Sequence, residues 1–327
     1  MATLERPNLT LRPFSDADYP TLASLWNESY PEYGRTIEEI RRFDADWRPE
    51  GFFQRRVMAE ENGVAVGYSD TFHSRGQFVP DNYFVDVIVR PSARCRGIGG
   101  VLYQDAERVV RVRRAHWARN AVKESLADSV AFARKIGAVE LKRDWESRLD
   151  LASFDPAPFA AAPERAAAQG VRITTLADEM KTDPGAVRKA YELHAVARVD
   201  APGLDPATPS PFERFEQEVL RAPYALPEAY FIAIRDGRYV GESALAKEGT
   251  DPSVIDQQLT GVLRDERGKG IAMALKLKAV EYARAHGLRQ IRTWNDSLNR
   301  PMLAINEALG FAKEPAWITF GKDLSAE

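Results

Sequence analysis

The stretch Ile255–Ala272, IDQQLTGVLRDERGKGIA, decides how the second half of this chain is interpreted. It predicts a strand over Gln258–Leu263, a short charged turn, and then a Gly-rich basic segment that opens a long helix. The first N–H groups of a helix have no intrahelical partners, point one way, and carry the positive end of the helix dipole. Because Gly268 and Gly270 let a ligand approach the backbone closely, the stretch predicts a binding site for a phosphate-bearing ligand.

The spacing of the glycines excludes two common phosphate loops. No Gly-Lys pair is followed by Ser or Thr, so the turn is not a nucleoside triphosphate loop. A third glycine is missing after Gly270, so the dinucleotide fingerprint fails as well. The turn resembles instead the pyrophosphate loop of the GNAT superfamily of acyl-CoA-dependent N-acetyltransferases. The family motif, Arg or Gln, two residues, Gly, one residue, Gly or Ala, fits Arg267, Gly270 and Ala272.

The same motif occurs twice in the chain. Arg94, Gly97 and Gly99 repeat it, and Arg94 precedes Arg267 by 173 positions. The Asn62-Gly63 and Asp236-Gly237 turns, each between apolar runs, repeat at nearly the same interval and predict two β-hairpins. A repeat of this length indicates a duplicated domain.

The chain is therefore expected to hold two tandem GNAT domains of the α/β (α+β) class. The resemblance implies that each domain is a mixed, mostly antiparallel, splayed sheet flanked by helices. We place the N-terminal domain at residues 1–155, an Ala- and Pro-rich linker at 156–169, and the C-terminal domain at 170–327. Strands over Trp145–Leu151 and Ala316–Phe320 are expected to close the first and second domains, respectively.

Composition limits the class of protein. The chain has 327 residues, 44% of them hydrophobic and 28% charged, as in soluble globular proteins. A net charge of −3 gives no indication of a nucleic-acid partner, and the four dispersed histidines show no metal-ligand spacing. No apolar run suits a membrane span and the N-terminus lacks a signal-peptide core, so a cytoplasmic location and no membrane partner are expected. The sequence leaves a homodimer open.

The resemblance implies acetyl-CoA as cosubstrate, without a metal. In the family, the pantetheine pairs with the strand before the loop, the pyrophosphate lies on the loop, and an Asn opens a late helix. The corresponding residues of the C-terminal half are Val262, Leu263, Arg267, Gly268, Lys269, Gly270, Ile271, Ala272 and Asn299. Those of the N-terminal half are Val89, Arg94, Arg96, Gly97, Ile98 and Gly99.

Catalytic residues are also assigned by resemblance. In some GNAT enzymes a carboxylate eleven residues before the motif's first residue is the general base, and this position is Asp256. Glu242 and Glu248 are the alternative bases. In the non-catalytic interpretation, Asp256 is simply an exposed aspartate at the start of a strand. The family's thiolate-protonating Tyr is replaced by Asn306, which can donate a hydrogen bond but is a poor proton donor. The corresponding positions of the N-terminal half, Tyr83 among them, hold no base and no acid.

These observations predict an N-acetyltransferase whose C-terminal half acetylates a primary amine of a small molecule. The N-terminal half is expected to be catalytically degenerate. Two alternatives stay open, namely a non-catalytic acyl-CoA-binding or sensing protein and a protein N-acetyltransferase. Asp200 and Asp205 lie in the loop region where the family builds its acceptor site and are candidate substrate contacts, as are the aromatic residues Trp26, Tyr30, Tyr33 and Trp47 of the N-terminal half.

Overall fold

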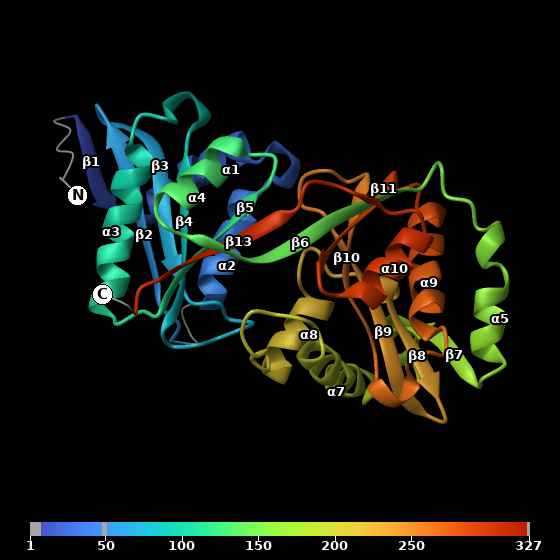
Figure 1. Ribbon diagram of the computed structural model, residues 1–327. Coiled ribbons are helices and arrows are strands. Elements are labelled where there is room, and N and C mark those ends of the chain that lie inside the picture. Colours follow the sequence, from blue (N-terminus) through green and yellow to red (C-terminus); the bar gives the residue numbers. More distant parts are fainter. Residues whose placement is uncertain (1–7, 48–50, 326–327) are drawn as a thin grey trace. The chain divides into compact units, whose positions relative to one another are not determined.

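The computed structural model describes residues 8–47 and 51–325, and these form two compact units. The N-terminal unit comprises residues up to Arg143 together with Trp317 onward, and the C-terminal unit comprises Asp144–Ala316. Each unit is a mixed, mostly antiparallel sheet with helices on both faces, as expected for a duplicated GNAT chain (Figure 1).

The N-terminal unit has the strand order β1-β2-β3-β4-β5-β13, in which only β4 and β5 run parallel. Its elements are β1 (Leu9–Pro13), α1 (Tyr19–Ser29), α2 (Ile37–Trp47), β2 (Gln54–Glu61), β3 (Val64–Phe72), β4 (Asn82–Val89), α3 (Ile98–Val112), β5 (Trp117–Lys123), α4 (Ala127–Lys135) and β13 (Trp317–Asp323).

The C-terminal unit has the order β6-β11-β10-β9-β8-β7, with β10 and β11 parallel and the short β12 beside β6. Its elements are β6 (Val139–Asp150, entering this unit at Asp144), α5 (Ala161–Ala167), β7 (Val171–Thr175), α6 (Leu176–Glu179), α7 (Ala186–Val199), α8 (Phe212–Leu220), β8 (Tyr230–Arg235), β9 (Arg238–Lys247), β10 (Val254–Val262), α9 (Ile271–Ala285), β11 (Gln290–Asp296), α10 (Arg300–Ala308) and β12 (Ala312–Lys313).

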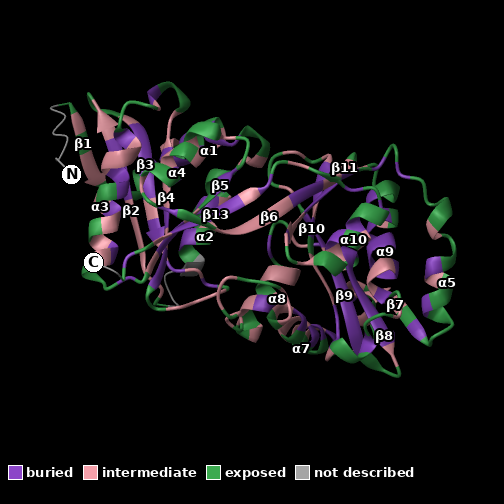
Figure 2. Cartoon of the chain, viewed as in Figure 1, coloured by how far each residue is buried: buried purple, intermediate pink, exposed green. Residues whose placement is uncertain are grey.

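Local sequence signals explain the matching hairpins. Asn62-Gly63 and Asp236-Gly237 all have positive φ, from 51° to 77°, which is the conformation a two-residue turn between twisted strands requires. The strands that follow these turns, β3 and β9, are mostly buried, as expected of central strands. Strand β8, which precedes the second turn, is buried along almost its whole length (Figure 2).

Two glycines show which helices cover which face of the C-terminal sheet. A Cβ at Gly241 on β9 would lie 3.2 Å from Ile271 of α9, whereas a Cβ at Gly261 on β10 would lie 2.6 Å from the Cβ of Ala197 on α7. Gly261 pairs with Glu242, the residue after Gly241, so the two glycines face opposite sides. Helix α9 therefore covers one face of the sheet and α7 the other (Figure 1).

The expected domain boundaries differ from the two units. Residues 144–150 of β6 pair with β11 in the C-terminal unit, and β13 pairs with β5 in the N-terminal unit. The two closing strands are thus exchanged relative to the expectation, because alternating strands of this kind satisfy either sheet equally well.

The segment expected to be a linker is ordered. Within residues 156–169, helix α5 buries Ala162 and Ala166 and packs against α9. Alanine is a strong helix former, and Pro163 lies in the first turn, where its missing N–H costs nothing.

Candidate functional site

The loop before α9 has the geometry of an anion-binding site. Gly268 and Gly270 both have φ of +76°, and Gly270 is the residue at which the helix begins. The first helical hydrogen bond joins the Ala274 N–H to the Gly270 oxygen, so the N–H groups of Ile271 and Ala272 remain at the open end of the helix. The Ile271 side chain is buried in the core and fixes the helix start.

The strand before this loop is opened on one side. Parallel pairing of β10 with β11 ends at Asp256 and Arg292, although β10 continues to Val262. The register of β10 against β9 also shifts between Gln257 and Thr260, which is a β-bulge. Backbone groups beyond Asp256 are thereby turned away from β11, which is the arrangement needed to pair with an extended ligand such as pantetheine.

The positive side chains of the loop are held by neighbours of the same unit. Arg267 donates from Nε to the Val262 oxygen at 3.0 Å and from its terminal nitrogen to Asp200 at 2.6 Å. Lys269 pairs with Glu266 at 2.8 Å. The loop cations therefore shape the turn, and the open N–H groups and glycines are left to contact an anion. Leu263 is buried, and its N–H donates to the Val240 oxygen at 2.9 Å.

Asp200 has a different role from the one expected. Its side chain is 8% exposed and bridges Arg264 and Arg267, both at 2.6 Å. These arginines hold the pKa of Asp200 below its ordinary value. Asp200 thus links the end of α7 to the loop and is not free to receive an acceptor, while Asp205 lies half-buried in the following loop.

The N-terminal loop repeats this construction. Gly97 begins α3 with φ of +82°, and Ile98 is buried beneath it. Arg94 donates from Nε to the Val89 oxygen at 3.0 Å, as Arg267 does to Val262, and Arg96 pairs with Glu61 at 2.7 Å. A Cβ at Gly99, the counterpart of Ala272, would lie 3.7 Å from Phe132 and 3.8 Å from Val87, which are ordinary contact distances.

The N-terminal strand differs from its counterpart. Parallel pairing of β4 with β5 also stops early, at Phe84 and Arg119, but the register of β4 against β3 runs unbroken from Phe84 to Val89. Among the described residues, the bulge before the loop is therefore a property of the C-terminal unit.

Asp256 lies in a buried ionic cluster on the α7 face of the C-terminal sheet. Its two oxygens accept from Arg292 at 2.8 and 3.1 Å, and Arg292 also lies 3.7 Å from Glu248. Glu146, fully buried, pairs with Arg148 at 2.7 Å beside them. Burial raises the pKa of Asp256 above its ordinary value, Arg292 lowers it, and Glu248 and Glu146 raise it again. With a side chain that is 17% exposed, Asp256 is not an exposed strand-start residue.

The two alternative carboxylates are already occupied. Glu248 accepts from the Thr250 N–H at 2.7 Å and so fixes the turn after β9. Glu242 is 1% exposed, accepts from the Tyr230 hydroxyl, and lies 3.2 Å from Nδ1 of His194. Burial lowers the pKa of His194, but the bond and charge of Glu242 outweigh it and raise that pKa overall.

This Glu242–His194–Tyr230 cluster lies beside Gly261 of β10, on the face covered by α7. From the sequence, only Glu242 of this cluster was a candidate site residue, as an alternative general base. The pairing with His194 joins positions 48 residues apart on different elements, and no local motif signals it.

Asn299 and Asn306 both lie on α10. Asn299 caps the helix, and its side-chain oxygen accepts from the Met302 N–H at 3.4 Å. Asn306 is 2% exposed and donates from Nδ2 to Asn295 at 2.7 Å. Its own amide oxygen is buried with no hydrogen-bond partner in the described part of the chain, so one polar atom of Asn306 is left for another group.

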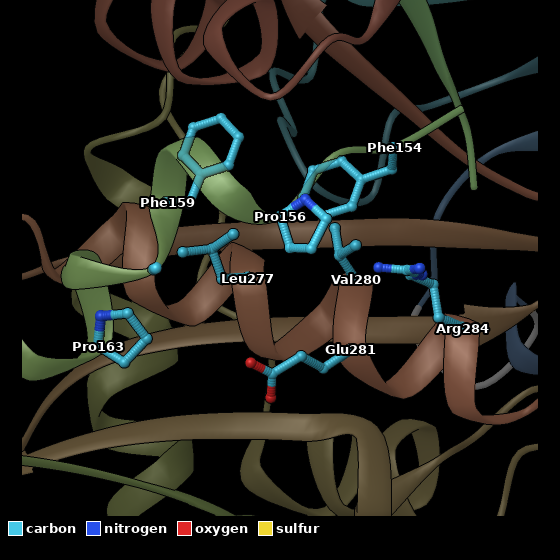
Figure 3. Close-up of a pocket in the computed structure, with 9 residues that line it drawn as sticks. Phe154, Pro156, Phe159, Pro163, Leu277, Val280, Glu281 and Arg284 are labelled. Atoms are coloured by element: carbon cyan, nitrogen blue, oxygen red, sulfur yellow. The ribbon is translucent and has the colours of Figure 1, made fainter. Parts of the chain in front are cut away.

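A pocket lies elsewhere on the C-terminal unit. It has a volume of about 330 Å³ between α9 and the segment around α5 (Figure 3). Phe154, Phe159 and Leu277 form its apolar walls, and Glu281 and Arg284 lie at its rim (Figure 3). Residues of the loop and of the Asp256 cluster do not line it.

Residues 8–47 and 51–325 hold neither a metal-binding cluster nor a membrane-spanning helix. No group of three or more His, Cys, Asp or Glu side chains in this part of the chain is arranged to hold a metal ion. None of its helices combines the length and apolar character that a bilayer crossing requires.

Comparison with known proteins decides the family. The family model described as "Acetyltransferase (GNAT) family" matches the chain twice, over residues 19–138 and 191–311. The chain belongs to the GNAT acetyltransferase family. It is an N-acetyltransferase built of two GNAT repeats, and both matched segments contain a glycine loop and the helix that follows it.

Two relatives match this GNAT chain along most of its length. It is 29% identical to a mycothiol acetyltransferase of Thermobispora bispora over 237 residues, or 70% of this chain and 72% of the relative. It is 28% identical to that of Thermobifida fusca over 283 residues, 81% of each chain. The tandem architecture is also similar to that of mycothiol synthase, as the duplicated loops lead one to expect.

Solved structures agree on the fold. A tandem GNAT protein from the clavulanic acid biosynthesis pathway superposes with a TM-score of 0.71 and 22% identity, covering 96% of this chain and 98% of that one. A GCN5-related N-acetyltransferase from Sphaerobacter thermophilus superposes with a TM-score of 0.69 and 23% identity, covering 96% of this chain and 95% of that one.

Proposed function

We propose that the C-terminal unit transfers an acetyl group from acetyl-CoA to a primary amine of a small molecule. The observation that carries this proposal is the combination, in one unit, of an open helix start at Gly270 with a bulged strand whose parallel pairing stops at Asp256. The N-terminal unit has the first feature, but the register of β4, its strand before the loop, is unbroken against β3.

The residues present fit acetyl-CoA. Gly268 and Gly270 adopt a conformation that side chains disfavour, and no heavy atom lies within 4 Å of a Cβ built at either position. The N–H groups at the start of α9 would receive the pyrophosphate, and the backbone of β10 near Val262 would receive the pantetheine. When bound, acetyl-CoA supplies an activated thioester carbonyl for attack by an amine.

Asp256 is our candidate for the group that takes the proton of the acceptor amine, directly or through a water. Buried carboxylates whose pKa is raised are better bases near neutral pH than exposed ones. Arg292 holds both oxygens of Asp256, which fixes the orientation of the carboxylate and limits the rise in its pKa.

Asn306 is our candidate for a hydrogen-bond contact to the departing sulfur. The free atom of Asn306 is its amide oxygen, so a contact to the sulfur requires the amides of Asn306 and Asn295 to turn together and bring Nδ2 of Asn306 to the open position. The amide does not supply a proton, and protonation of the thiolate is therefore assigned to solvent.

The acceptor is expected to be a small cationic molecule. Three carboxylates, Glu146, Glu248 and Asp256, share the cluster on the α7 face with two guanidinium groups. This excess of negative charge favours an ammonium group. The relatives' name, mycothiol acetyltransferase, also refers to a small molecule rather than a protein.

The role of Asp256 is tested by Asp256→Asn. We expect turnover with the best amine of a broad panel to fall by a factor of about 10²–10⁴, the usual range for loss of a general base, while acetyl-CoA affinity is unchanged. Asp236→Asn, at an exposed turn where Asn is well tolerated, is the matched control. Unchanged turnover in Asp256→Asn would remove the base assignment.

The location of the donor site is tested by Gly270→Val and Gly97→Val, each measured by calorimetric titration with acetyl-CoA. Valine strains the left-handed backbone and blocks the approach of a pyrophosphate. We expect Gly270→Val to abolish acetyl-CoA binding at the C-terminal loop, and turnover with it, whereas Gly97→Val should leave binding at that loop and turnover intact. The reverse result would move the catalytic site to the N-terminal unit.

A further inference from the structure

Two aspartates of the N-terminal unit face each other across neighbouring strands. Asp70 on β3 and Asp86 on β4 are direct partners in the antiparallel register. Directly opposed side chains in such a pair have Cβ atoms about 5 Å apart, and like charges there are destabilising. Their neighbours Tyr68 and Ile88 pack in the core cluster of α1, so the aspartates project toward the α1 face of the sheet.

The charges of this pair are only partly compensated. Arg56 donates to one oxygen of Asp70 and also pairs with Asp44 at 2.7 Å. The other oxygen of Asp70 is buried with no hydrogen-bond partner among the described residues. Asp86 is half-buried and, in the part of the chain that the structure describes, has neither a hydrogen bond nor an ion pair.

An exposed cation, Arg35, lies on Trp26, which packs against the same core cluster as Tyr68 and Ile88. The Arg35 guanidinium stacks on the Trp26 ring, 3.6 Å from its centroid, and its side chain makes no ion pair with a described residue. Its charge influences Asp86, Asp70 and Tyr68. Arg35 and Asp86 form no ion pair, and the charge of each acts on the pKa of the other.

Two buried tyrosines complete the surroundings. Tyr68 is 5% exposed and Tyr30 is 9% exposed, and neither hydroxyl forms a hydrogen bond with a described residue. Burial raises the pKa of Tyr30 to about 12, and the charges of Asp86 and Arg35 also act on it. The charges of Asp86 and Arg35 act on both hydroxyls, and each hydroxyl is left to bond another group.

The fold gains nothing from this arrangement. The buried, unpaired oxygen of Asp70 and the half-buried, unpaired carboxylate of Asp86 each carry a desolvation cost that a ligand would offset, whereas Arg35 is exposed and open to a ligand. Burial, with the help of Asp70, raises the pKa of Asp86 to about 7, against an opposing effect of Arg35. Perturbed carboxyls of this kind are characteristic of functional sites.

We propose that the N-terminal unit binds a small zwitterionic ligand on the α1 face of β3 and β4. The ammonium group of the ligand lies at Asp86 and Asp70, and its anionic group lies at Arg35. Tyr30 and Tyr68 donate to the ligand or accept from it. This site is separate from the Asp256 cluster, and the proposal does not depend on which unit transfers the acetyl group.

The test is calorimetric titration of the full chain with ω-amino acids of increasing length, namely glycine, 3-aminopropanoate, 4-aminobutanoate and 6-aminohexanoate. We expect one length to bind best, because the separation of Asp86 and Arg35 selects it. Butylamine and butanoate, which each lack one of the two charges, should bind at least tenfold more weakly. Asp86→Asn and Arg35→Gln should each weaken the best binder at least tenfold.

Matched variants and donor-site variants separate this site from the proposed active site. Asp81→Asn and Arg108→Gln change exposed residues of the same unit and should leave binding unchanged. Gly270→Val, which disables the C-terminal loop, should also leave it unchanged. Failure of every amino acid to bind at about 50 mM, or binding that survives both Asp86→Asn and Arg35→Gln, would overturn the proposal.

Discussion

Asp86 and Asp256 are both half-buried aspartates with raised pKa values, but their neighbours differ. Asp256 is held by two of the three nitrogens of Arg292, whereas Asp86 has no such partner among the described residues. The first arrangement orients a charged carboxylate, and the second leaves a carboxylate to respond to a ligand or to pH. Position in the sheet alone therefore does not define the role of a carboxylate in this fold.

The unpaired state of Asp86 predicts a pH-dependent stability. Its folded pKa of about 7 lies above the unfolded value of 3.8, so the folded state binds more protons between these values. Stability should consequently fall as pH rises from about 4 to about 7 and then level off. Asp86→Asn should remove this loss and raise the Tm by about 2–4 °C at pH 8, which corresponds to about 1 kcal/mol, with little change at pH 4. Scanning calorimetry at the two pH values measures the difference, and a lower Tm at pH 8 would contradict it.

At the scale of elements, the sequence was most informative where a local conformation is required. The loops before α3 and α9 were predicted from glycines, and Gly97, Gly268 and Gly270 all have positive φ. The two hairpins were predicted for the same reason. Asp86 was missed because it lies eight residues before Arg94, whereas the family count of eleven leads to Tyr83, a core residue.

The packing of α7 on β10 depends on Gly261. A Cβ there would lie 2.6 Å from the Cβ of Ala197, closer than side chains approach, so Gly261→Ala should destabilise the chain by about 1–3 kcal/mol. Because the Cβ of Ala197 is the atom that would clash, adding Ala197→Gly to the Gly261→Ala variant should recover much of the lost stability, measured by urea unfolding. Gly100→Ala, which meets nothing within 4 Å, is the control and should be neutral or stabilising. Equal stability of Gly261→Ala and wild type would show that α7 moves away at no cost.

At the scale of the whole chain, strand partners could not be read from the sequence. The strands around residues 145–151 and 316–320 were expected, but each was assigned to the wrong sheet. Alternating apolar residues indicate a strand and a buried face without specifying the neighbour, because pairing is a non-local interaction. The ordered α5 segment was missed for a related reason, since its burial depends on α9.

Strand β13 predicts an unusual effect of truncation. Ile318 and Phe320 are buried in a cluster with Val122 and Ala133 of the N-terminal unit, and β13 pairs with β5 along seven residues. A chain ending at residue 316 should therefore lose amide protection in β5 and α4, although more than 170 residues separate them from the cut. Phe320→Ala should weaken the same region by about 3–5 kcal/mol without removing the strand. Hydrogen exchange followed by peptide mass spectrometry distinguishes the outcomes. Loss of amide protection confined to β10 and β11 would instead show that β13 belongs to the C-terminal unit, as the sequence analysis expected.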